Sequence, residues 1–327
     1  MPGGAPVPPA TARTYLGDDV SDLYFPGAHV AERGDRPAYV MAATGETVTY
    51  AELHERANRI ARLFRELGLQ PGDHVAWCME NHPWYLSLAW GAHYAGLYYT
   101  AISSRLTGEE AAYIVDDCGA RVLILSEQKS GLAAELASTT PKVEHRFMLD
   151  GVVDGYTAFE DAVAAQPSDD LPDATEGVDM LYSSGTTGRP KGVKAPLRGV
   201  PLGTPDALFM LVAGLFGANP ETVYLSPAPL YHAAPLRFCM QVQRAGGTVV
   251  VMDHFDPELT LQLIEQHRVT FGQFVPTMFV RMLKLPEEVR NRYDVSSLQV
   301  AVHAAAPCPI PVKEQMIEWW GPVLHEY

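Results

Sequence analysis

The residues whose types and spacing best suit chemistry stand in one short run, residues 181–193, which reads LYSSGTTGRPKGV. Its glycines let backbone N–H groups converge, its hydroxyls add hydrogen-bond donors, and Lys191 adds a positive charge. This combination suits a polyphosphate. The spacing is not that of a Walker loop, because Pro190 precedes the lysine and prevents direct continuation into a helix. The run therefore predicts a phosphate loop of another kind.

A second candidate is the run LSPAPLYHAAP at residues 225–235, about forty residues after the first. Its histidine, His232, could hydrogen-bond a carboxylate or a phosphate, and the sequence leaves both options open. A lone histidine is more often a core or surface residue. His232 is therefore a candidate site residue because its run follows the first run at this spacing.

Together these runs resemble the adenylate-forming enzymes, a superfamily that includes acyl-CoA synthetases, luciferases and the adenylation domains of peptide synthetases. Residues 182–193 resemble its phosphate-loop signature, and residues 225–235 its Pro-Leu-Tyr/Phe-His block. Residues 271–278 resemble its Val-Pro-Thr segment, and residues 300–307 its small-residue strand end. A loop rich in Ser, Thr and Gly is often only a linker, but four matching blocks favour the family.

The resemblance implies a role for each matching residue. His232 and Lys191 are the candidate catalytic residues, and the chemistry needs no acyl-enzyme nucleophile. The ATP phosphates would be held by Ser183, Ser184, Gly185, Thr186, Thr187, Gly188 and Lys191; adenine would lie against Ala304, Ala305, Ala306 and Pro307; and the acid pocket would be lined by His232, Ala233, Ala234, Phe274, Val275, Pro276 and Thr277. At His303 many relatives carry glycine or serine, so that contact stays open. No metal-ligating residue is assigned.

The implied reaction is that of an AMP-forming acyl-CoA synthetase, in which a carboxylic acid reacts with ATP, with Mg²⁺ as counter-cation, and the acyl-AMP then reacts with CoA. Fatty, aryl and steroid side-chain acids all fit an apolar pocket. The adenylation domains of peptide synthetases usually carry an aspartate near the position of His232, which pairs with the amine of an amino acid. Here no acidic residue lies between Thr222 and Val251, and a buried unpaired amine is costly. We therefore favour an acid without an amine.

The resemblance covers roughly residues 20–327, the N-terminal part of the family's large domain. The family's Tyr-Gly-x-Thr-Glu block, ribose-binding aspartate and lid lysine have no counterpart in the 327 residues. We therefore expect a truncated enzyme that is inactive by itself. The alternative is a catalytically silent fragment that binds nucleotide or acid. Trp319, Trp320 and the apolar strand at 323–327 would form an exposed patch, which predicts a homo-oligomer.

The alternation of helical and short apolar segments predicts an α/β fold, and the resemblance implies two stacked αβαβα subdomains without the family's β-barrel subdomain and C-terminal lid. The predicted division is a disordered tail at 1–19, a first subdomain at 20–175 and a second at 176–327, with residues 166–173 as linker. Residues 83–102 are apolar enough to suggest a membrane span, but Gly91 and Gly96 favour a buried helix and strand.

Composition excludes several other classes. The net charge of −15 argues against nucleic acid or an anionic membrane as partner. The four cysteines, Cys78, Cys118, Cys239 and Cys308, have no C-x-x-C spacing, which predicts free thiols in a cytoplasmic protein. The eleven histidines show no metal-binding pattern. No signal peptide opens the chain.

Overall fold

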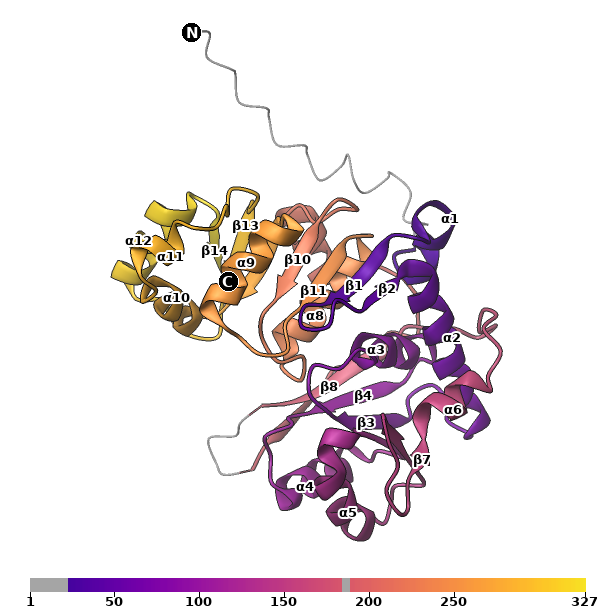
Figure 1. Ribbon diagram of the computed structural model, residues 1–327. Coiled ribbons are helices and arrows are strands. Elements are labelled where there is room, and N and C mark those ends of the chain that lie inside the picture. The colour runs from indigo at the N-terminus through magenta and orange to yellow at the C-terminus, as the bar shows by residue number, and fades with distance from the viewer. Residues whose placement is uncertain (1–22, 184–188) are drawn as a thin grey trace, which may run out of the picture.

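The computed structural model describes residues 23–183 and 189–327, and the predicted tail at residues 1–19 lies outside them. Two open sheets of seven strands each form the framework (Figure 1). Helices cover both faces of each sheet, as the predicted α/β class requires. No helix of the described ranges is long and apolar enough to cross a membrane.

The first sheet has the strand order β7-β6-β5-β3-β4-β8-β9. All neighbours are parallel except β8 and β9, which are antiparallel. Its strands are β3 (His74–Cys78), β4 (Tyr98–Ile102), β5 (Val122–Ser126), β6 (His145–Leu149), β7 (Thr157–Ala158), β8 (Val178–Ser183) and β9 (Lys191–Lys194). Fully buried strands such as β3, β4 and β5 carry continuous apolar runs, as parallel sheets with two covered faces require.

The second sheet has the order β14-β13-β12-β10-β11-β1-β2, and only the β1–β2 pair is antiparallel. Its strands are β1 (Pro37–Met41), β2 (Thr47–Thr49), β10 (Val223–Ser226), β11 (Thr248–Val251), β12 (Phe271–Phe274), β13 (Val300–His303) and β14 (Leu324–Glu326). Neither sheet closes into a barrel within the described residues.

Helices and single helical turns connect the strands of both sheets. They are η2 (Pro26–His29), α1 (Val30–Arg33), α2 (Tyr50–Glu66), α3 (Tyr85–Tyr94), α4 (Gly108–Cys118), η3 (Glu127–Lys129), α5 (Ser130–Thr139), α6 (Phe159–Ala164), α7 (Ala207–Phe209), the π-helix η4 (Met210–Leu215), α8 (Ala233–Arg244), α9 (Pro257–His267), α10 (Pro276–Leu283), α11 (Glu287–Arg290) and α12 (Ile310–Trp320). A capping box of Thr107 and Glu110 starts α4.

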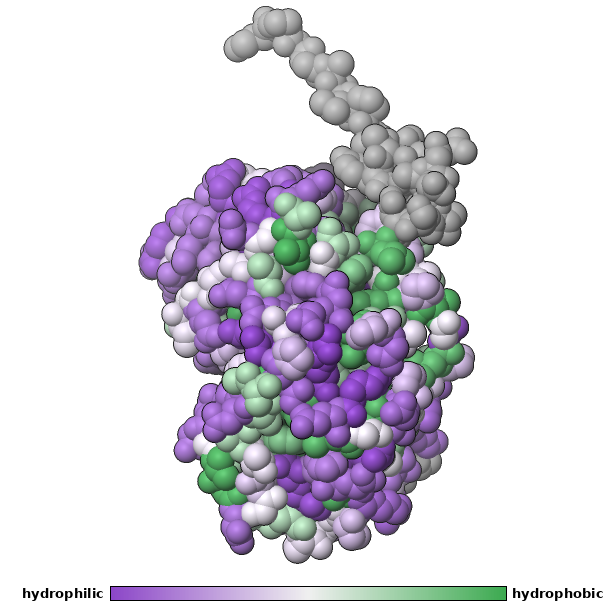
Figure 2. Space-filling model, turned by 90° about the vertical axis from the view of Figure 1, so that its right-hand side faces the viewer, coloured by the Kyte–Doolittle hydropathy of each residue, from purple (hydrophilic) through white to green (hydrophobic). Residues whose placement is uncertain are grey.

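Three apolar cores show that the layers follow the order predicted from the resemblance. One core, between the sheets, joins α2, α3 and α8 to inward-facing strand residues such as Trp77. A second lies between the first sheet and α4 and α5, where the neighbouring Cys78 points. The third lies between the second sheet and α9, α10 and α12. This αβαβα stack confirms the predicted architecture. On the face in Figure 2, polar side chains dominate and the apolar ones form scattered patches.

The strands of the two sheets are not divided at the predicted subdomain boundary between residues 175 and 176. The early hairpin β1–β2 belongs to the second sheet, because Tyr39 of β1 pairs in parallel register with Val249 of β11. The later hairpin β8–β9 belongs to the first sheet, because Tyr98 of β4 pairs with Val178. The sheets are therefore interlocked, and a cut at this boundary would separate paired strands.

The segment 166–173, predicted as a linker between subdomains, instead connects two parts of the first sheet. It is held on α2, where Arg62 donates to the carbonyl oxygens of Asp169 and Asp170 at 2.9 Å each, and Arg65 pairs with Asp173 at 3.0 Å. Leu171 is buried. The polar residues that suggested a linker instead make these contacts with α2.

The two tryptophans near residue 320 do not form the exposed patch that was predicted. Trp320 is buried, and its ring packs against Phe274 and Phe279 at centroid distances of 5.4 and 5.9 Å. Trp319 is partly buried beside it. Because α12 folds back onto the second sheet, the tryptophans give no support to the predicted homo-oligomer.

Candidate functional site

The run predicted to be a phosphate loop begins in β8 and ends in β9, which form an antiparallel hairpin. In the antiparallel register Ser183 at the end of β8 lies opposite Lys191 at the start of β9, so the strands bring the two ends of the loop together. Ser184, Gly185, Thr186, Thr187 and Gly188 lie outside the described residues, so their predicted phosphate contacts stay predictions. Ser183 and Lys191 are both exposed. Within the described ranges Lys191 makes no ion pair, which leaves its charge available to a ligand.

The base of the hairpin is fixed by a close contact between Gly192 and Tyr182. A methyl group on Gly192 would lie 2.9 Å from Cζ of Tyr182 and 2.6 Å from Cε of Met180. Tyr182 in turn donates a hydrogen bond to Asp117 at the end of α4. Burial, followed by this hydrogen bond to an acceptor carboxylate, raises the pKa of the phenol. The glycine of the motif therefore allows the strand to pack on a ring anchored to α4.

His232 occupies the N-cap position of α8, with extended backbone angles. Its ring is exposed and lies 4.4 Å, centroid to centroid, from the ring of Tyr231. Partial desolvation lowers the pKa of His232 below its usual value, and the positive charge of Arg105 lowers it further. The imidazole is therefore neutral at pH 7, with one donor and one acceptor nitrogen.

His232 and the phosphate hairpin line one cavity, of about 550 Å³, which we call the phosphate-side cavity. The hairpin contributes Tyr182, Ser183, Arg189 and Pro190, and the start of α8 contributes Ala233. The structure thus brings together two motifs that lie far apart in the sequence. Lys191 is not among the residues that line this cavity.

A second cavity, of about 460 Å³, shares Tyr231 and His232 with the first as lining residues. It contains two arginines that the sequence reading did not select, Arg105 and Arg281, and we call it the arginine cavity. Neither arginine forms an ion pair within the described residues. Arg105 lies three residues after the end of β4, and side chains beyond the carboxyl ends of parallel strands often meet ligands, so its position in the sequence could have identified it.

The residues predicted to line the acid pocket separate into two groups. Ala233 lines the phosphate-side cavity and Thr277 the arginine cavity. Phe274 does neither, because it is fully buried against α10 and α12. Ala234, Val275 and Pro276 pack against the cores or start α10, and His232 lines both cavities. The Val-Pro-Thr segment is thus a turn from strand to helix, from which Thr277 and Met278 reach the arginine cavity.

The predicted adenine surface is open to solvent at the end of β13. Ala305, Ala306 and Pro307 are exposed, and Ala304 is half-buried. Ala305 adopts a left-handed backbone with φ of 72°, which is uncommon for a residue other than glycine. Strained backbone of this kind concentrates at ligand sites. His303 just before it is fully buried against Phe279, and neither ring nitrogen has a partner within the described residues.

The described residues contain no group of three or more His, Cys, Asp or Glu side chains arranged to hold a metal ion. Carboxylates are nevertheless near, since Glu80 and Asp253 line the arginine cavity. A divalent cation would therefore need oxygen ligands from a bound molecule. Phosphate oxygens supply such ligands when Mg²⁺ arrives with a nucleotide.

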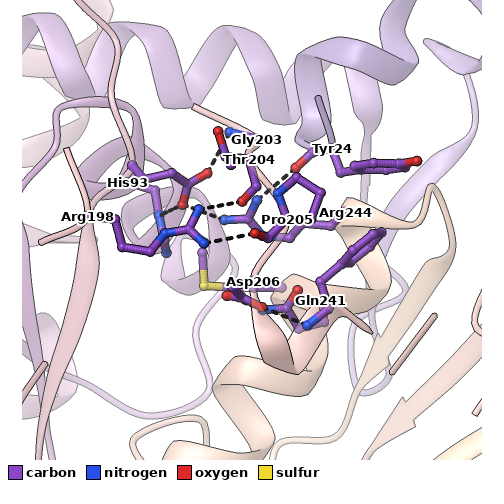
Figure 3. Close-up of polar contacts among 12 residues, drawn as sticks. Tyr24, His93, Arg198, Gly203, Thr204, Pro205, Asp206, Gln241 and Arg244 are labelled. Atoms are coloured by element: carbon purple, nitrogen blue, oxygen red, sulfur yellow. Dashed lines mark hydrogen bonds and ion pairs between the residues drawn. The ribbon is translucent and has the colours of Figure 1, made fainter. Parts of the chain in front are cut away.

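Polar contacts connect α8, which begins at His232, to the strand that carries the phosphate loop. Arg237 pairs with Asp179 of β8 at 2.6 Å, and Arg244 pairs with Glu176 at 2.7 Å. His93 of α3 also contacts Glu176, at 3.2 Å (Figure 3). Burial by itself raises the pKa of Glu176, but His93 and then Arg244 outweigh it and lower the value to about 2. These contacts fix α8 relative to β8.

Comparison with known proteins identifies the group to which these features belong. The family described as "AMP-binding enzyme" matches residues 27–327. A feruloyl-CoA synthase of Amycolatopsis sp. is 33% identical over 276 residues, which cover 84% of this chain and 52% of that protein. The 4-coumarate–CoA ligase 3 of rice, Oryza sativa subsp. japonica, is 31% identical, with 86% and 50% covered. The chain thus spans about half the length of these relatives.

A solved structure shows the same fold. The crystal structure of the anthranilate CoA ligase AuaEII in complex with anthranoyl-AMP superposes with a TM-score of 0.80 at 22% identity, covering 94% of this chain and 60% of that chain. At this identity the likeness concerns the fold alone. It agrees with the layered arrangement of the two sheets described above.

Proposed function

Because the chain belongs to the AMP-binding enzyme family, we propose that it forms part of an ATP-dependent ligase that converts a carboxylic acid to acyl-AMP and then to a CoA thioester. The observation that carries this proposal is the shared cavity between His232 and the β8–β9 hairpin. One wall supplies phosphate-binding residues and the other a neutral imidazole. Acid activation needs both a nucleotide triphosphate and a carboxylate at one point.

In the proposed first step a carboxylate oxygen attacks the α-phosphorus of ATP, and the bond to the pyrophosphate oxygen breaks. Lys191, Arg189 and the Ser183 hydroxyl would bind the phosphate oxygens and stabilise the charge that moves onto pyrophosphate. Mg²⁺ would be bound through the same phosphates. Neutral His232 would donate one hydrogen bond to the carboxylate or the α-phosphate. No proton transfer is required, so position and charge supply the rate enhancement.

In the proposed second step the CoA thiol attacks the acyl carbon and AMP leaves. The arginine cavity is the candidate entry for CoA, because Arg105 and Arg281 form no ion pair with the described side chains and offer positive charge to its phosphates. It meets the phosphate-side cavity at Tyr231 and His232. A thiol delivered there would arrive beside the acyl group. This assignment rests on chemistry and position.

The substrate is proposed to be an acid with an apolar body, aromatic or aliphatic. The phosphate-side cavity offers Ala101, Leu106 and Ile114 as apolar lining. The two relatives named above act, by their names, on ferulate and 4-coumarate. We favour the aryl class over fatty and steroid side-chain acids on that ground. A cytoplasmic location is proposed because Cys78, Cys118 and Cys239 are buried free thiols.

Binding of Mg·ATP to the 327-residue chain, followed by isothermal titration calorimetry, tests the phosphate side of the proposal. Lys191→Ala should weaken binding by roughly 10- to 100-fold, since a hydrogen bond to a charged group contributes about 1.5–3 kcal/mol. Lys194→Ala is the matched control on the same strand, because Lys194 instead contacts His74 at 2.9 Å. If the two substitutions changed the affinity for Mg·ATP equally, Lys191 would have no specific role in phosphate binding.

A further inference from the structure

The loop of residues 79–84, between β3 and α3, makes side-chain contacts with both sheets. Its Glu80 accepts a hydrogen bond from Oγ of Ser126, the last residue of β5, at 2.7 Å. Its His82 lies 2.7 Å, Nε2 to Oδ2, from Asp150, which directly follows β6. The residues on either side of position 81 are thus held at the carboxyl end of the first sheet.

Asn81, between these two anchors, makes its contacts with the second sheet. Its Oδ1 accepts the Leu230 N–H at 2.8 Å, and its Nδ2 donates to the carbonyl oxygens of Met252 at 2.7 Å and Ala228 at 3.2 Å. The residue is only 8% exposed. The contacts fix the orientation of the amide, because a flipped amide would place its oxygen against two carbonyl oxygens. Both amide hydrogens are used, so the side chain serves the fold and not a ligand.

The segment that leads from β10 to His232, residues 227–231, depends on these contacts. It contains two prolines, which have no N–H to donate. The ladder of β10 and β11 ends just before it, where the Met252 N–H donates to the Ser226 carbonyl oxygen at 3.0 Å. The amide of Asn81 therefore supplies hydrogen bonds to the backbone where those of the sheet stop.

The place of His232 follows from the place of this segment. His232 comes two residues after Leu230 and lines both the phosphate-side cavity and the arginine cavity. The phosphate hairpin belongs to the first sheet, whereas His232 follows a strand of the second. A contact that joins the two sheets beside His232 therefore sets its distance from the hairpin. Such placement matters, because a shift of about 1 Å in a reacting group can lower a rate by about 100-fold.

We propose that Asn81 is a positioning residue for the acid-activating reaction: its buried amide holds the segment before His232 at a fixed place relative to the first sheet. The part of His232 in the reaction rests on the proposed function, whereas its placement by Asn81 does not. Without this amide the imidazole remains in the chain, but the backbone that carries it is free to move away from the place where the two cavities share His232.

NMR titration of the His232 imidazole C–H signals in the ligand-free 327-residue chain tests this placement, with a His232→Gln spectrum to assign the signals. Partial burial lowers the pKa of His232 below its usual value. In Asn81→Ala the freed segment should let more water reach the ring, so the pKa should rise toward the ordinary value. The Leu230 N–H, which loses its acceptor, should exchange with solvent at least about tenfold faster.

The matched control is Asn58→Ala. Asn58 is only 1% exposed, and its amide accepts the Leu171 N–H and donates to Asp170, each at 3.2 Å. Both substitutions remove a buried amide and should lower the free energy of unfolding, but only Asn81→Ala should change the His232 pKa and the Leu230 exchange rate.

If Asn81→Ala does not fold, Asn81→Ser, which keeps one hydroxyl group, is measured with the same expectation. An unchanged His232 pKa in the folded variant, or equal changes in the Asn81 and Asn58 variants, would overturn the inference. Failure of the wild-type chain to bind Mg·ATP would instead overturn the proposed function, and the NMR result on the ligand-free chain would still decide whether Asn81 places His232.

Discussion

Arg237 of α8 and Asp179 of β8 form a two-point ion pair, with Nη2 to Oδ2 at 2.6 Å and Nε to Oδ1 at 3.0 Å. The arginine side chain is 40% exposed, but the aspartate side chain is only 9% exposed. The pair joins the helix that begins at His232 to the strand that ends at Ser183. The contact thus links two motifs that lie about forty residues apart in the sequence.

The first prediction concerns this pair. Arg237→Met should lower the free energy of unfolding by about 2 kcal/mol, because it leaves the Asp179 charge buried without a partner. The double variant Asp179→Asn with Arg237→Met should recover part of that loss. Urea denaturation followed by circular dichroism measures both.

The matched control is Arg292→Met, since Arg292 pairs with Glu258 at 2.9 Å on the surface, with side chains 56% and 41% exposed. That substitution should cost less than about 1 kcal/mol. If Arg237→Met and Arg292→Met had the same effect, the Arg237–Asp179 pair would be a surface contact and not a connection between α8 and β8.

The second prediction concerns Gly192 in the phosphate hairpin. Gly192→Ala should destabilise the protein by about 1–3 kcal/mol, because the new methyl group must displace Tyr182 from its place next to α4. Gly131→Ala is the control: Gly131 lies in α5, and a methyl group there meets no atom within 4 Å. It should stabilise by about 0.5–1 kcal/mol. Thermal unfolding measures both, and a neutral Gly192→Ala would contradict the close contact.

The third prediction follows from the lowered pKa of Glu176. Its folded value of about 2 lies below the ordinary value of 4.5, so its contribution is fully present above pH 4.5 and is lost as the pH falls toward 2. The wild type should lose stability across this window. Glu176→Gln should lose less of it, since no carboxylate remains to protonate. Urea denaturation at pH 5 and pH 3 measures the difference, and parallel losses would exclude Glu176 as the cause.

The fourth prediction concerns the charge state of His232. Since Arg105 contributes to lowering the pKa of His232, Arg105→Gln should raise that pKa. NMR titration of the imidazole C–H signals measures the change directly. Arg281→Gln serves as comparison, because Arg281 lines the same cavity without acting on His232 to the same degree. If Arg105→Gln leaves the pKa of His232 unchanged, the charge of Arg105 does not act on the imidazole.

The layer order and most helices could be predicted from sequence because local signals are strong there. The helix at residues 257–267 begins with Asp256 as N-cap and Pro257 at its first position, and the structure shows those bounds. Thr107 and Glu110 likewise mark the start of α4.

Strand partners and side-chain directions could not be predicted in the same way, because they depend on contacts distant in sequence. Nothing local shows that Tyr39 pairs with Val249, so the interlocking of the two sheets was missed. Phe274 belongs to a matching motif, yet its strand position directs it into the core. Gln241 and Asp206 are likewise far apart in the sequence, and only the fold brings Nε2 of Gln241 to 3.3 Å from Oδ2 of Asp206.

The central claim is that this chain supplies the phosphate and acid sites of an acid-activating ligase, and acid-dependent ATP–pyrophosphate exchange tests it most directly. The assay compares the 327-residue chain alone with the chain joined to the C-terminal half of the Amycolatopsis feruloyl-CoA synthase, which the chain does not cover. We predict exchange with 4-hydroxycinnamate in the joined form, a loss of at least about tenfold in Lys191→Ala, and no exchange in the chain alone. If a well-folded joined form shows no exchange, or if Lys191→Ala leaves the exchange rate unchanged, the claim is contradicted.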